Sequence, residues 1–557
     1  MSIADTRRLQ MFPILSDLQR QAALHFASTP LRHYGPHQVL YKTGDAAIPA
    51  FLLLSGTVEI IRYDGMGRPS KVTLHEAGQI TGETTQLAGR PSLVEGRAGP
   101  AGCDVVSFDA AHLRALVIGS AEIGEIVMRA FILRRTAFIT EGVAGSVLVG
   151  RAGDPRLVRL QGFLRSNGYP YTVLDPASDP DAAAIIERFA LHDEDLPIAL
   201  APDGTLMKRP SDTQLGITLG ITPELRLDQR FDVAVVGAGP AGLATAVYAA
   251  SEGLSTIVLD SHAFGGQAGA SARIENYFGF PTGISGIALT ARAFTQAQKF
   301  GAEIAIPLEV ARLDCEVEDG LRLILVDGRV VQARTIVIAS GARYRRPGIP
   351  NLSTFEGAGV AYWASPVEAK LCEGQEVALV GGGNSAGQAA AYLAPKVKRL
   401  HLVVRGASLE ASMSRYLAER IAALPNVEMY LGTEVVALDG EPEVALSGAT
   451  FRSRGTGKML TIRLQHLFLF VGAEPNTAWL AGCAIHTDAK GFVMTGELAD
   501  GGGCPKPSGL RLGLETSVAG VFAIGDVRSG STKRVAAAVG EGAAAVAQLH
   551  ATLAHSG

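Results

Sequence analysis

The chain has 557 residues, of which 47% are hydrophobic and 19% charged, and its formal net charge is −4. This length exceeds what one hydrophobic core supports and predicts several domains of about 100–200 residues each. The small net charge gives no reason to expect nucleic acid or an anionic membrane as a partner. No apolar run approaches the roughly 18 residues of a membrane span, and the N-terminus lacks the layout of a signal peptide, so we expect a cytoplasmic protein.

Glycine and cysteine usage narrows the class further. The 65 glycines favour nucleotide-binding folds, because glycine lets the backbone approach a ligand closely or adopt positive φ. The five cysteines are scattered singly and form no C-x-x-C motif, which supports neither a zinc site nor a secreted disulfide framework. We therefore expect no bound metal.

Residues 1–143 form the first predicted domain. Short apolar runs at 37–45, 50–65, 71–80 and 103–109 alternate with turns and predict a small β-roll. Residues 110–139 then repeat apolar side chains every three or four positions. This spacing predicts a helical segment that covers the roll and leads out of it.

The first domain resembles a cyclic-nucleotide-binding domain, in its early strands and in the cassette "GQITGETTQLAGRPSLVEGRA" at 78–98. The resemblance implies that Gly82 and Glu83 supply backbone N–H groups for a cyclic phosphate and a carboxylate for the ribose. The arginine that pairs with the phosphate in that family aligns with Ser92 in this chain. Arg90 lies two residues away, so its side chain begins at a different backbone position. Losing such a contact costs about ten- to a hundredfold in affinity. We therefore favour a structural or protein-contact role over cAMP or cGMP binding, with an unidentified ligand as a further alternative.

Residues 144–224 predict a small α/β domain with strands at 146–150 and 171–175 and helices after each. The order resembles a thioredoxin or glutaredoxin fold, with Leu196-Pro197 at the place of that fold's cis-proline and a hairpin turn at 202–204. The redox cysteines that would open its first helix are missing. The domain is then expected to serve in docking or as a scaffold.

Residues 231–260 carry a first dinucleotide fingerprint. A buried strand leads into Gly237-x-Gly239-x-x-Gly242 and a helix, and a second strand ends in Asp260. These glycines allow a tight turn, close approach to a pyrophosphate and close helix–strand packing, and the acid is placed to accept ribose hydroxyls. The alternative is a glycine-rich turn without a ligand.

A second fingerprint lies at 376–406, with Gly381-x-Gly383-x-x-Ala386. Its second strand ends in Arg405 where the first unit has an acid, which favours NADPH over NADH because arginine pairs with a ribose 2′-phosphate. Arg405 could instead be a solvated charge at a strand end. Arg415 either helps to bind the 2′-phosphate or lies on an exposed helix face.

Three further motifs, at 264–281, 337–350 and 520–545, resemble in order and content the thioredoxin reductase family of flavoproteins. The resemblance covers 225–557 and implies FAD, a nicotinamide donor and a homodimer. It places Gln267 and Asn276 along the flavin, Asp526 at its ribityl–phosphate end and Lys533 to Val535 at the isoalloxazine edge. The candidate FAD-binding residues are Gly237, Gly239, Pro240, Ala241, Gly242, Asp260, Gly265, Gly266, Gln267, Asn276, Ala339, Gly341, Gly525, Asp526, Lys533, Arg534 and Val535. The candidate NADPH-binding residues are Gly381, Gly383, Asn384, Ser385, Ala386 and Arg405.

The redox cysteines of that family have no counterpart here. In "AYWASPVEAKLC" the two positions read Trp363 and Pro366, and Cys372 has no neighbouring thiol in the sequence. Disulfide exchange needs an attacking thiolate and a resolving thiol, so we assign no catalytic residue and do not expect thioredoxin reduction at this place. Trp363 could shield the flavin face from oxygen, although we prefer the interpretation that its side chain packs at a domain interface.

The sequence thus predicts a multidomain protein with a β-roll, a thioredoxin-like α/β domain and two Rossmann-like domains. The predicted boundaries are 1–143, 144–224, 225–346 (FAD, first part), 347–473 (NAD(P)H) and 474–557 (FAD, second part). We expect an FAD-dependent oxidoreductase that takes hydride from NADPH and passes electrons to an external quinone, ferredoxin or flavodoxin, oxygen or partner disulfide. The alternatives are a redox or nucleotide sensor with little turnover and a disulfide reductase that uses partner cysteines or Cys372.

Overall fold

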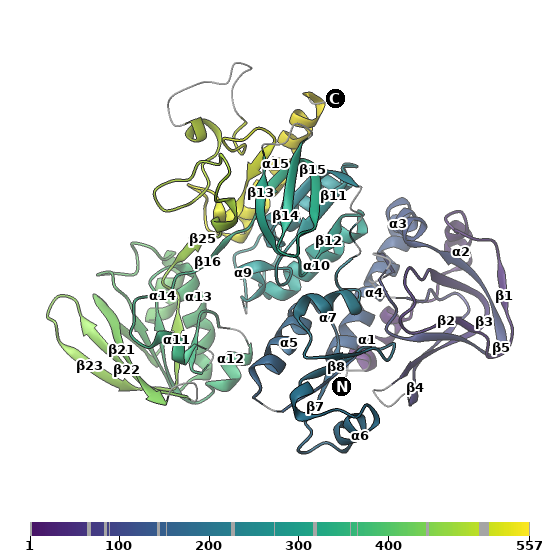
Figure 1. The fold of residues 1–557 in the computed structure, drawn as a ribbon, viewed down its shortest axis with the longest axis horizontal. Helices are drawn as coiled ribbons and strands as arrows, with labels where there is room; N and C mark the ends of the chain where they lie inside the picture. Colours follow the sequence, from purple (N-terminus) through teal and green to yellow (C-terminus); the bar gives the residue numbers. More distant parts are fainter. Residues whose placement is uncertain are drawn as a thin grey trace.

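The structure is a computed structural model that describes residues 3–63, 68–82, 86–87, 90–141, 145–151, 153–223, 225, 229–271, 273–315, 320–356, 358–364, 366–441, 445–500 and 512–555. Figure 1 shows four units in chain order: the roll in purple, a small α/β unit in blue, a domain in teal and yellow, and a domain in green inserted into it. Among the helices of the described residues, none is long and apolar enough to cross a membrane.

The N-terminal domain is an antiparallel roll with helices on one side, as the alternating apolar runs predict. Its sheet has the order β1-β5-β3-β4, and β2 also pairs with β5. The long predicted helix is divided at Ser120, where the backbone is extended. The elements are α1 (Ile3–Met11), α2 (Asp17–Leu24), β1 (Arg32–Tyr34), β2 (Val39–Tyr41), β3 (Ala50–Tyr63), β4 (Pro69–Glu76), β5 (Glu95–Phe108), α3 (Ala110–Gly119) and α4 (Ala121–Glu141).

A buried arginine fastens helix α4 to the start of the cassette. Arg134 is only 5% exposed. Its guanidinium donates to the carbonyl oxygens of Met11, Ile80 and Gly82, each at 2.8 Å. Because these are charge-assisted bonds in a desolvated place, they fix the cassette entrance relative to α4.

The small α/β unit has a four-stranded sheet of order β7-β6-β8-β9. The Leu196–Pro197 peptide is cis, as predicted, and β8 and β9 form the predicted hairpin. Its likeness to a thioredoxin fold stays a prediction. One hydrophobic cluster joins it to the roll, since Leu148 and Leu160 pack in the same core as Tyr34 and Val105. The elements are β6 (Ser146–Val149), α5 (Pro155–Ser166), β7 (Tyr171–Leu174), α6 (Pro180–Arg188), η2 (Asp193–Asp195), β8 (Ile198–Leu200), β9 (Leu206–Lys208) and α7 (Asp212–Thr218).

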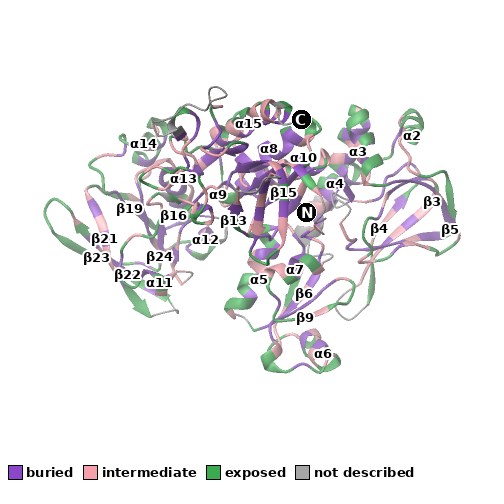
Figure 2. Ribbon diagram, turned by 45° about the horizontal axis from the view of Figure 1, so that its top comes forward, coloured by how far each residue is buried: buried purple, intermediate pink, exposed green. Residues whose placement is uncertain are grey.

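The first Rossmann domain is built on a sheet of order β12-β11-β10-β15-β14-β13, with β26 paired to β15. Its central strands are parallel and buried (Figure 2). The elements are β10 (Arg230–Val236), α8 (Pro240–Ser251), β11 (Thr256–Leu259), α9 (Gly266–Gly269), α10 (Gly286–Lys299), β12 (Glu303–Ala305), β13 (Val310–Asp314), β14 (Leu321–Leu325), β15 (Val330–Ile338), η4 (Ala478–Leu480), η5 (Gly496–Asp500), β26 (Val521–Ala523), η6 (Gly525–Val527) and α15 (Val535–His555).

The inserted Rossmann domain has a parallel sheet of order β17-β24-β18-β19-β20 beside an antiparallel β21-β22-β23 sheet. The chain enters it on β16 (Ala342–Tyr344) and returns on β25 (Ala473–Pro475), and these two strands pair with each other (Figure 1). The elements between them are α11 (Leu352–Phe355), β17 (Val360–Ala361), α12 (Pro366–Leu371), β18 (Glu376–Val380), α13 (Asn384–Leu393), η3 (Ala394–Lys396), β19 (Arg399–Val403), α14 (Arg415–Ala422), β20 (Val427–Tyr430), β21 (Thr433–Glu441), β22 (Ala445–Ser453), β23 (Met459–Arg463) and β24 (His466–Leu469).

His75 makes the stability of the roll depend on pH. It is 2% exposed, and burial, then the nearby Arg134 guanidinium, hold its pKa well below the ordinary value, while a hydrogen bond with the Gln79 side chain opposes this shift. Below about pH 6.5 the His75 imidazole binds a proton in the unfolded chain but not in the folded chain. The free energy of unfolding therefore has its full value above that pH and falls as the pH drops. We predict a loss of up to about 1.4 kcal/mol per pH unit in this range.

Urea unfolding of the full chain at several pH values, followed for the transition of the roll, measures this slope. His75→Phe keeps a ring beside Phe12, whose ring centroid lies 5.5 Å from that of His75. This variant should flatten the pH dependence, and an unchanged slope in His75→Phe would assign the effect to another group.

Candidate functional site

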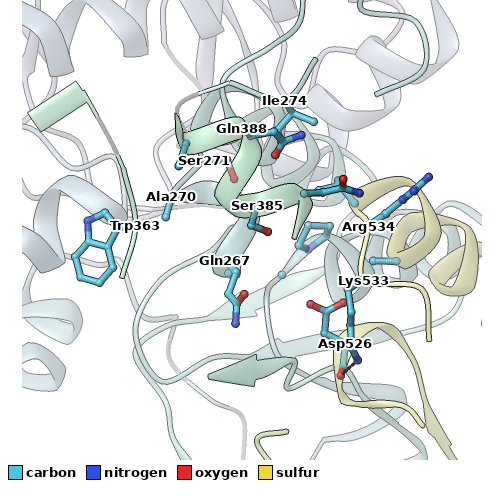
Figure 3. A pocket seen from close by; sticks show the side chains of 18 of the residues that line it. Gln267, Ala270, Ser271, Ile274, Trp363, Ser385, Gln388, Asp526, Lys533 and Arg534 are labelled. Carbon is cyan, nitrogen blue, oxygen red and sulfur yellow. Dashed lines mark hydrogen bonds between the residues drawn. The ribbon is translucent and has the colours of Figure 1, made fainter. Parts of the chain in front are cut away.

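A cavity of about 660 Å³ lies between the two Rossmann domains, a size typical of small-molecule and cofactor sites. Figure 3 shows side chains of both domains around it, including Ser385 and Gln388 from α13 and Asp526 and Lys533 from the segment before α15. The predicted FAD residues that line it are Gly237, Gly239, Pro240, Ala241, Asp260, Gly266, Gln267, Asn276, Ala339, Gly341, Gly525, Asp526, Lys533, Arg534 and Val535. Of the predicted NADPH residues, Asn384 and Ser385 line it. The predicted residues outside its lining are Gly242, Gly265, Gly381, Gly383, Ala386 and Arg405.

The first fingerprint forms the turn between β10 and α8. Gly237 has φ +114°, and a Cβ there would lie 2.2 Å from the Ala339 carbonyl oxygen. A Cβ at Gly242 would lie 1.9 Å from the Gly237 carbonyl oxygen, so this glycine serves helix–strand packing. Helix α8 begins after Gly239 without a side-chain cap, which leaves its first N–H groups for a ligand at the cavity.

The Asp260 carboxylate is held at the end of β11 by backbone donors. Oδ2 accepts the Ala238 N–H at 2.8 Å, and Oδ1 accepts the N–H groups of His262 and Ala263 at 2.9 and 3.3 Å. Burial raises its pKa, and these three hydrogen bonds oppose the shift. Because a carboxylate has about four acceptor positions, Asp260 keeps acceptor capacity for hydroxyl groups in the cavity.

The opposite wall begins with the glycine pair at the start of α9, where Gly265 is the N-cap and Gly266 the first helical residue. Gly266 has φ +51°, and a Cβ there would lie 3.1 Å from the Gly239 Cα, so the two backbones are close where a phosphate chain would pass. Gly265 has φ +102°, and its Cβ would lie 2.8 Å from Thr290 Oγ1. Gln267 donates through Nε2 to the Ala342 carbonyl oxygen, which fixes its side chain beside the cavity.

Asp526 and Lys533 form the charged end of the cavity. Burial raises the Asp526 pKa and lowers the Lys533 pKa, while the attraction between the two charges opposes both shifts. Lys533 donates to the Asp526 carbonyl oxygen and to Ser531 Oγ, the latter at 2.8 Å, and its Nζ lies 4.4 Å from the Phe492 ring centroid. The cation is thereby held in place beside the cavity.

Glu541 supports this end from α15, and the sequence motifs do not single it out. Its Oε2 accepts the Gly525 N–H at 2.6 Å, and its Oε1 accepts Arg528 Nη2 at 2.6 Å. The carboxylate thus positions the Gly525-Asp526 turn. The only sequence signal is an acid in an otherwise alanine- and glycine-rich helix.

Helix α13 forms the wall that the inserted domain contributes. Ser385, Gln388 and Tyr392 recur at helical spacing and line the cavity. An ion pair between Arg420 Nη1 and Glu275 Oε2, at 2.8 Å, joins the two domains beside it. Sequence reasoning identified Ser385 but not Gln388, Tyr392 or Arg420.

Arg405 is exposed and lies outside this cavity, two residues beyond β19, whereas Asp260 directly follows β11 in the first domain. Gly381 has φ +152°, and a Cβ there would lie 2.6 Å from the Phe470 carbonyl oxygen. The second fingerprint therefore has the tight turn that its glycines predict.

Trp363 lines the cavity and is 42% exposed, with Nε1 donating to Glu368 Oε1 at 3.0 Å. Pro366 is the first residue of α12. Cys372 is fully buried, its Sγ donates to the Ala369 carbonyl oxygen at 3.6 Å, and burial raises its pKa to about 11. The Cys372 thiol is therefore not placed to attack a disulfide in the cavity.

In the roll, the cassette residues Gly82, Arg90 and Ser92 contact other residues of the chain. Ser92 Oγ donates to the Val94 carbonyl oxygen at 2.7 Å, and the Arg90 guanidinium lies 5.5 Å from the Phe294 ring centroid on α10. The Gly82 carbonyl accepts from Arg134, and Glu83 lies outside the described residues. The contact of Arg90 with Phe294 joins the cassette to the first Rossmann domain.

The tight turn leads to a prediction. Gly242→Ala should lower the free energy of unfolding by about 1–3 kcal/mol or more, because its Cβ has no room beside the Gly237 carbonyl. Gly540→Ala is the matched control, since a Cβ at that helical position meets nothing within 4 Å. Thermal unfolding of both variants tests this, and equal midpoints would contradict the assigned packing role of Gly242.

Comparison with known proteins gives two matches along the chain. Residues 231–542 match the family described as pyridine nucleotide-disulphide oxidoreductase, and residues 31–119 match the cyclic nucleotide-binding domain. The NADPH-dependent thioredoxin reductase 3 of Arabidopsis thaliana is 32% identical over 316 residues, which cover 56% of this chain and 56% of that protein. The chain thus spans little more than half the length of that relative.

Shorter relatives are covered almost completely. The thioredoxin reductase of Treponema pallidum (strain Nichols) is 32% identical over 319 residues, which cover 57% of this chain and 96% of that protein. The crystal structure of T. acidophilum thioredoxin reductase superposes with a TM-score of 0.52 at 28% identity and covers 58% of this chain and 99% of its own. The similarity to these proteins therefore lies in the two Rossmann domains.

Proposed function

Because this chain belongs to the pyridine nucleotide-disulphide oxidoreductase family, we propose that it is an FAD-dependent oxidoreductase that takes hydride from NADPH and passes electrons to an external acceptor. The observation that carries the proposal is a cavity lined by residues of the first fingerprint and by Asn384 and Ser385 of the second. A bound flavin would supply the exchange between a two-electron hydride donor and a separate acceptor.

The residues of the first Rossmann domain fit FAD. The uncapped N-terminus of α8 and the close Gly239–Gly266 backbones suit a pyrophosphate. Asp260 has acceptor capacity for the adenosine ribose, and the Lys533 cation suits the electron-rich edge of an isoalloxazine. The position of these residues at the cavity supports FAD as the proposed cofactor.

The acceptor is proposed to be external to this chain. Trp363 and Pro366 occupy the positions of the family's redox cysteines, and the nearby Cys372 thiol is buried. Trp363 lies at the cavity, so an acceptor that reaches the flavin from this side would meet an aromatic side chain. The candidate classes remain a quinone, a ferredoxin or flavodoxin, dioxygen and a partner disulfide.

NADPH is proposed as the donor on account of Arg405. Steady-state turnover with an artificial quinone measures KM for NADPH and for NADH. Arg405→Ala should raise KM for NADPH by about 10- to 100-fold, because a charge-assisted contact to the 2′-phosphate is lost, and should change KM for NADH little. The control is Arg399→Ala at the other end of β19, where the arginine pairs with Glu428 at 3.3 Å.

Two outcomes of this assay would contradict the proposal in different ways. Equal changes for NADPH and NADH would remove the 2′-phosphate role of Arg405. Turnover with the quinone no faster than reoxidation of the protein by air would favour a redox or nucleotide sensor over an enzyme.

A further inference from the structure

Two cysteines that are far apart in the sequence meet on the first Rossmann domain. Cys315 directly follows β13, and Cys483 comes three residues after η4. The strand β13 packs against η4, and both cysteines pack on one hydrophobic cluster that includes Leu313 and Leu480. The structure therefore brings together two thiols that looked isolated in the sequence.

Cys315 is the neighbouring ionisable group whose charge helps to raise the pKa of the Cys483 thiol, so the two side chains lie close to each other. A disulfide needs the sulfurs at about 2 Å, so its formation requires the two side chains to turn toward each other. Both side chains are partly exposed, whereas Cys103 and Cys372 are buried. A small oxidant can thus reach the pair more easily than the other cysteines among the described residues.

We propose that Cys315 and Cys483 form a redox-active dithiol that a hydroperoxide oxidises to an intramolecular disulfide. One thiolate attacks the peroxide, which breaks the O–O bond and leaves a sulfenic acid and, after proton transfer, water. The second thiol attacks that sulfur, the S–S bond forms and a second water leaves. Two thiols lose two electrons and two protons, and hydrogen peroxide is reduced to two waters.

At neutral pH the protonated thiol of Cys483 is favoured over the thiolate. Burial, followed by the neighbouring Cys315, raises the pKa of Cys483 to about 11, against a hydrogen bond from the Ile485 backbone. Because the thiolate is the nucleophile, oxidation of the pair is slow and follows sustained exposure to peroxide. Neither cysteine is among the residues that line the cavity, so the pair is separate from the proposed flavin site.

The disulfide would close a covalent loop that contains the whole inserted domain. The chain leaves the first Rossmann domain on β16, after Cys315, and returns on β25, before Cys483 (Figure 1). Cross-linking two distant positions restricts the unfolded chain and stabilises the fold, more so for long loops. The oxidised protein should therefore unfold at a higher temperature than the reduced protein.

The test uses the full chain treated with hydrogen peroxide and, in parallel, with dithiothreitol. Free thiols are blocked with N-ethylmaleimide, the protein is digested without reductant, and peptides are identified by mass spectrometry. We expect a peptide that joins Cys315 to Cys483, its loss on reduction, and a raised thermal midpoint in the oxidised sample. Cys315→Ser and Cys483→Ser should each remove the cross-link and the rise in midpoint.

Cys504 lies outside the described residues and provides the control. Cys504→Ser should keep the Cys315–Cys483 cross-link. A disulfide from either cysteine to Cys504, separate oxidation of the two thiols without a cross-link, or two intact thiols after Cys504 has been oxidised would each overturn the proposal. The peptide map of the unaltered chain decides this even where a serine variant fails to fold.

Discussion

The Asp260 carboxylate holds together the backbone that forms one side of the cavity between the two Rossmann domains. It accepts one N–H from the fingerprint turn, at Ala238, and two from the loop after β11, at His262 and Ala263. These bonds hold a carboxylate whose burial alone would favour the protonated form, so the turn, the loop and the charge stabilise one another. A small movement of this loop would change the position of the acid and of the turn together.

The same loop receives a contact that begins in the roll. Arg134 on α4 holds the cassette backbone at Gly82, and the adjacent Arg135 donates to the Gly168 carbonyl oxygen at 2.8 Å in the small α/β unit. The neighbouring Asn167 donates to the His262 carbonyl oxygen at 3.0 Å. Three hydrogen bonds, connected through residues that are neighbours in the chain, therefore link the cassette entrance with the loop that holds Asp260. These hydrogen bonds connect the N-terminal half of the chain to the cavity. The contact between Arg90 and Phe294 adds a second connection to the first Rossmann domain.

Local rules explain which parts of this arrangement could be predicted. The strand–turn–helix unit around Gly237 follows from glycine spacing next to a buried apolar run, and the structure places β10 and α8 there. Gln388 and Arg420 were not predicted, because the face that α13 and α14 turn to the cavity depends on how two domains sit against each other. Arg134 acts on carbonyl groups that are distant in sequence, so no local pattern identifies it. The proximity of Cys315 and Cys483 could not be predicted for the same reason, because the inserted domain separates them along the chain.

The central claim is that one cavity brings a nicotinamide donor and FAD together. The most direct measurement is anaerobic mixing of the FAD-loaded chain with NADPH while the flavin absorbance is followed. We expect the yellow colour to bleach in a single turnover, without any added acceptor. Protein that keeps its oxidised flavin spectrum with both NADPH and NADH would contradict it.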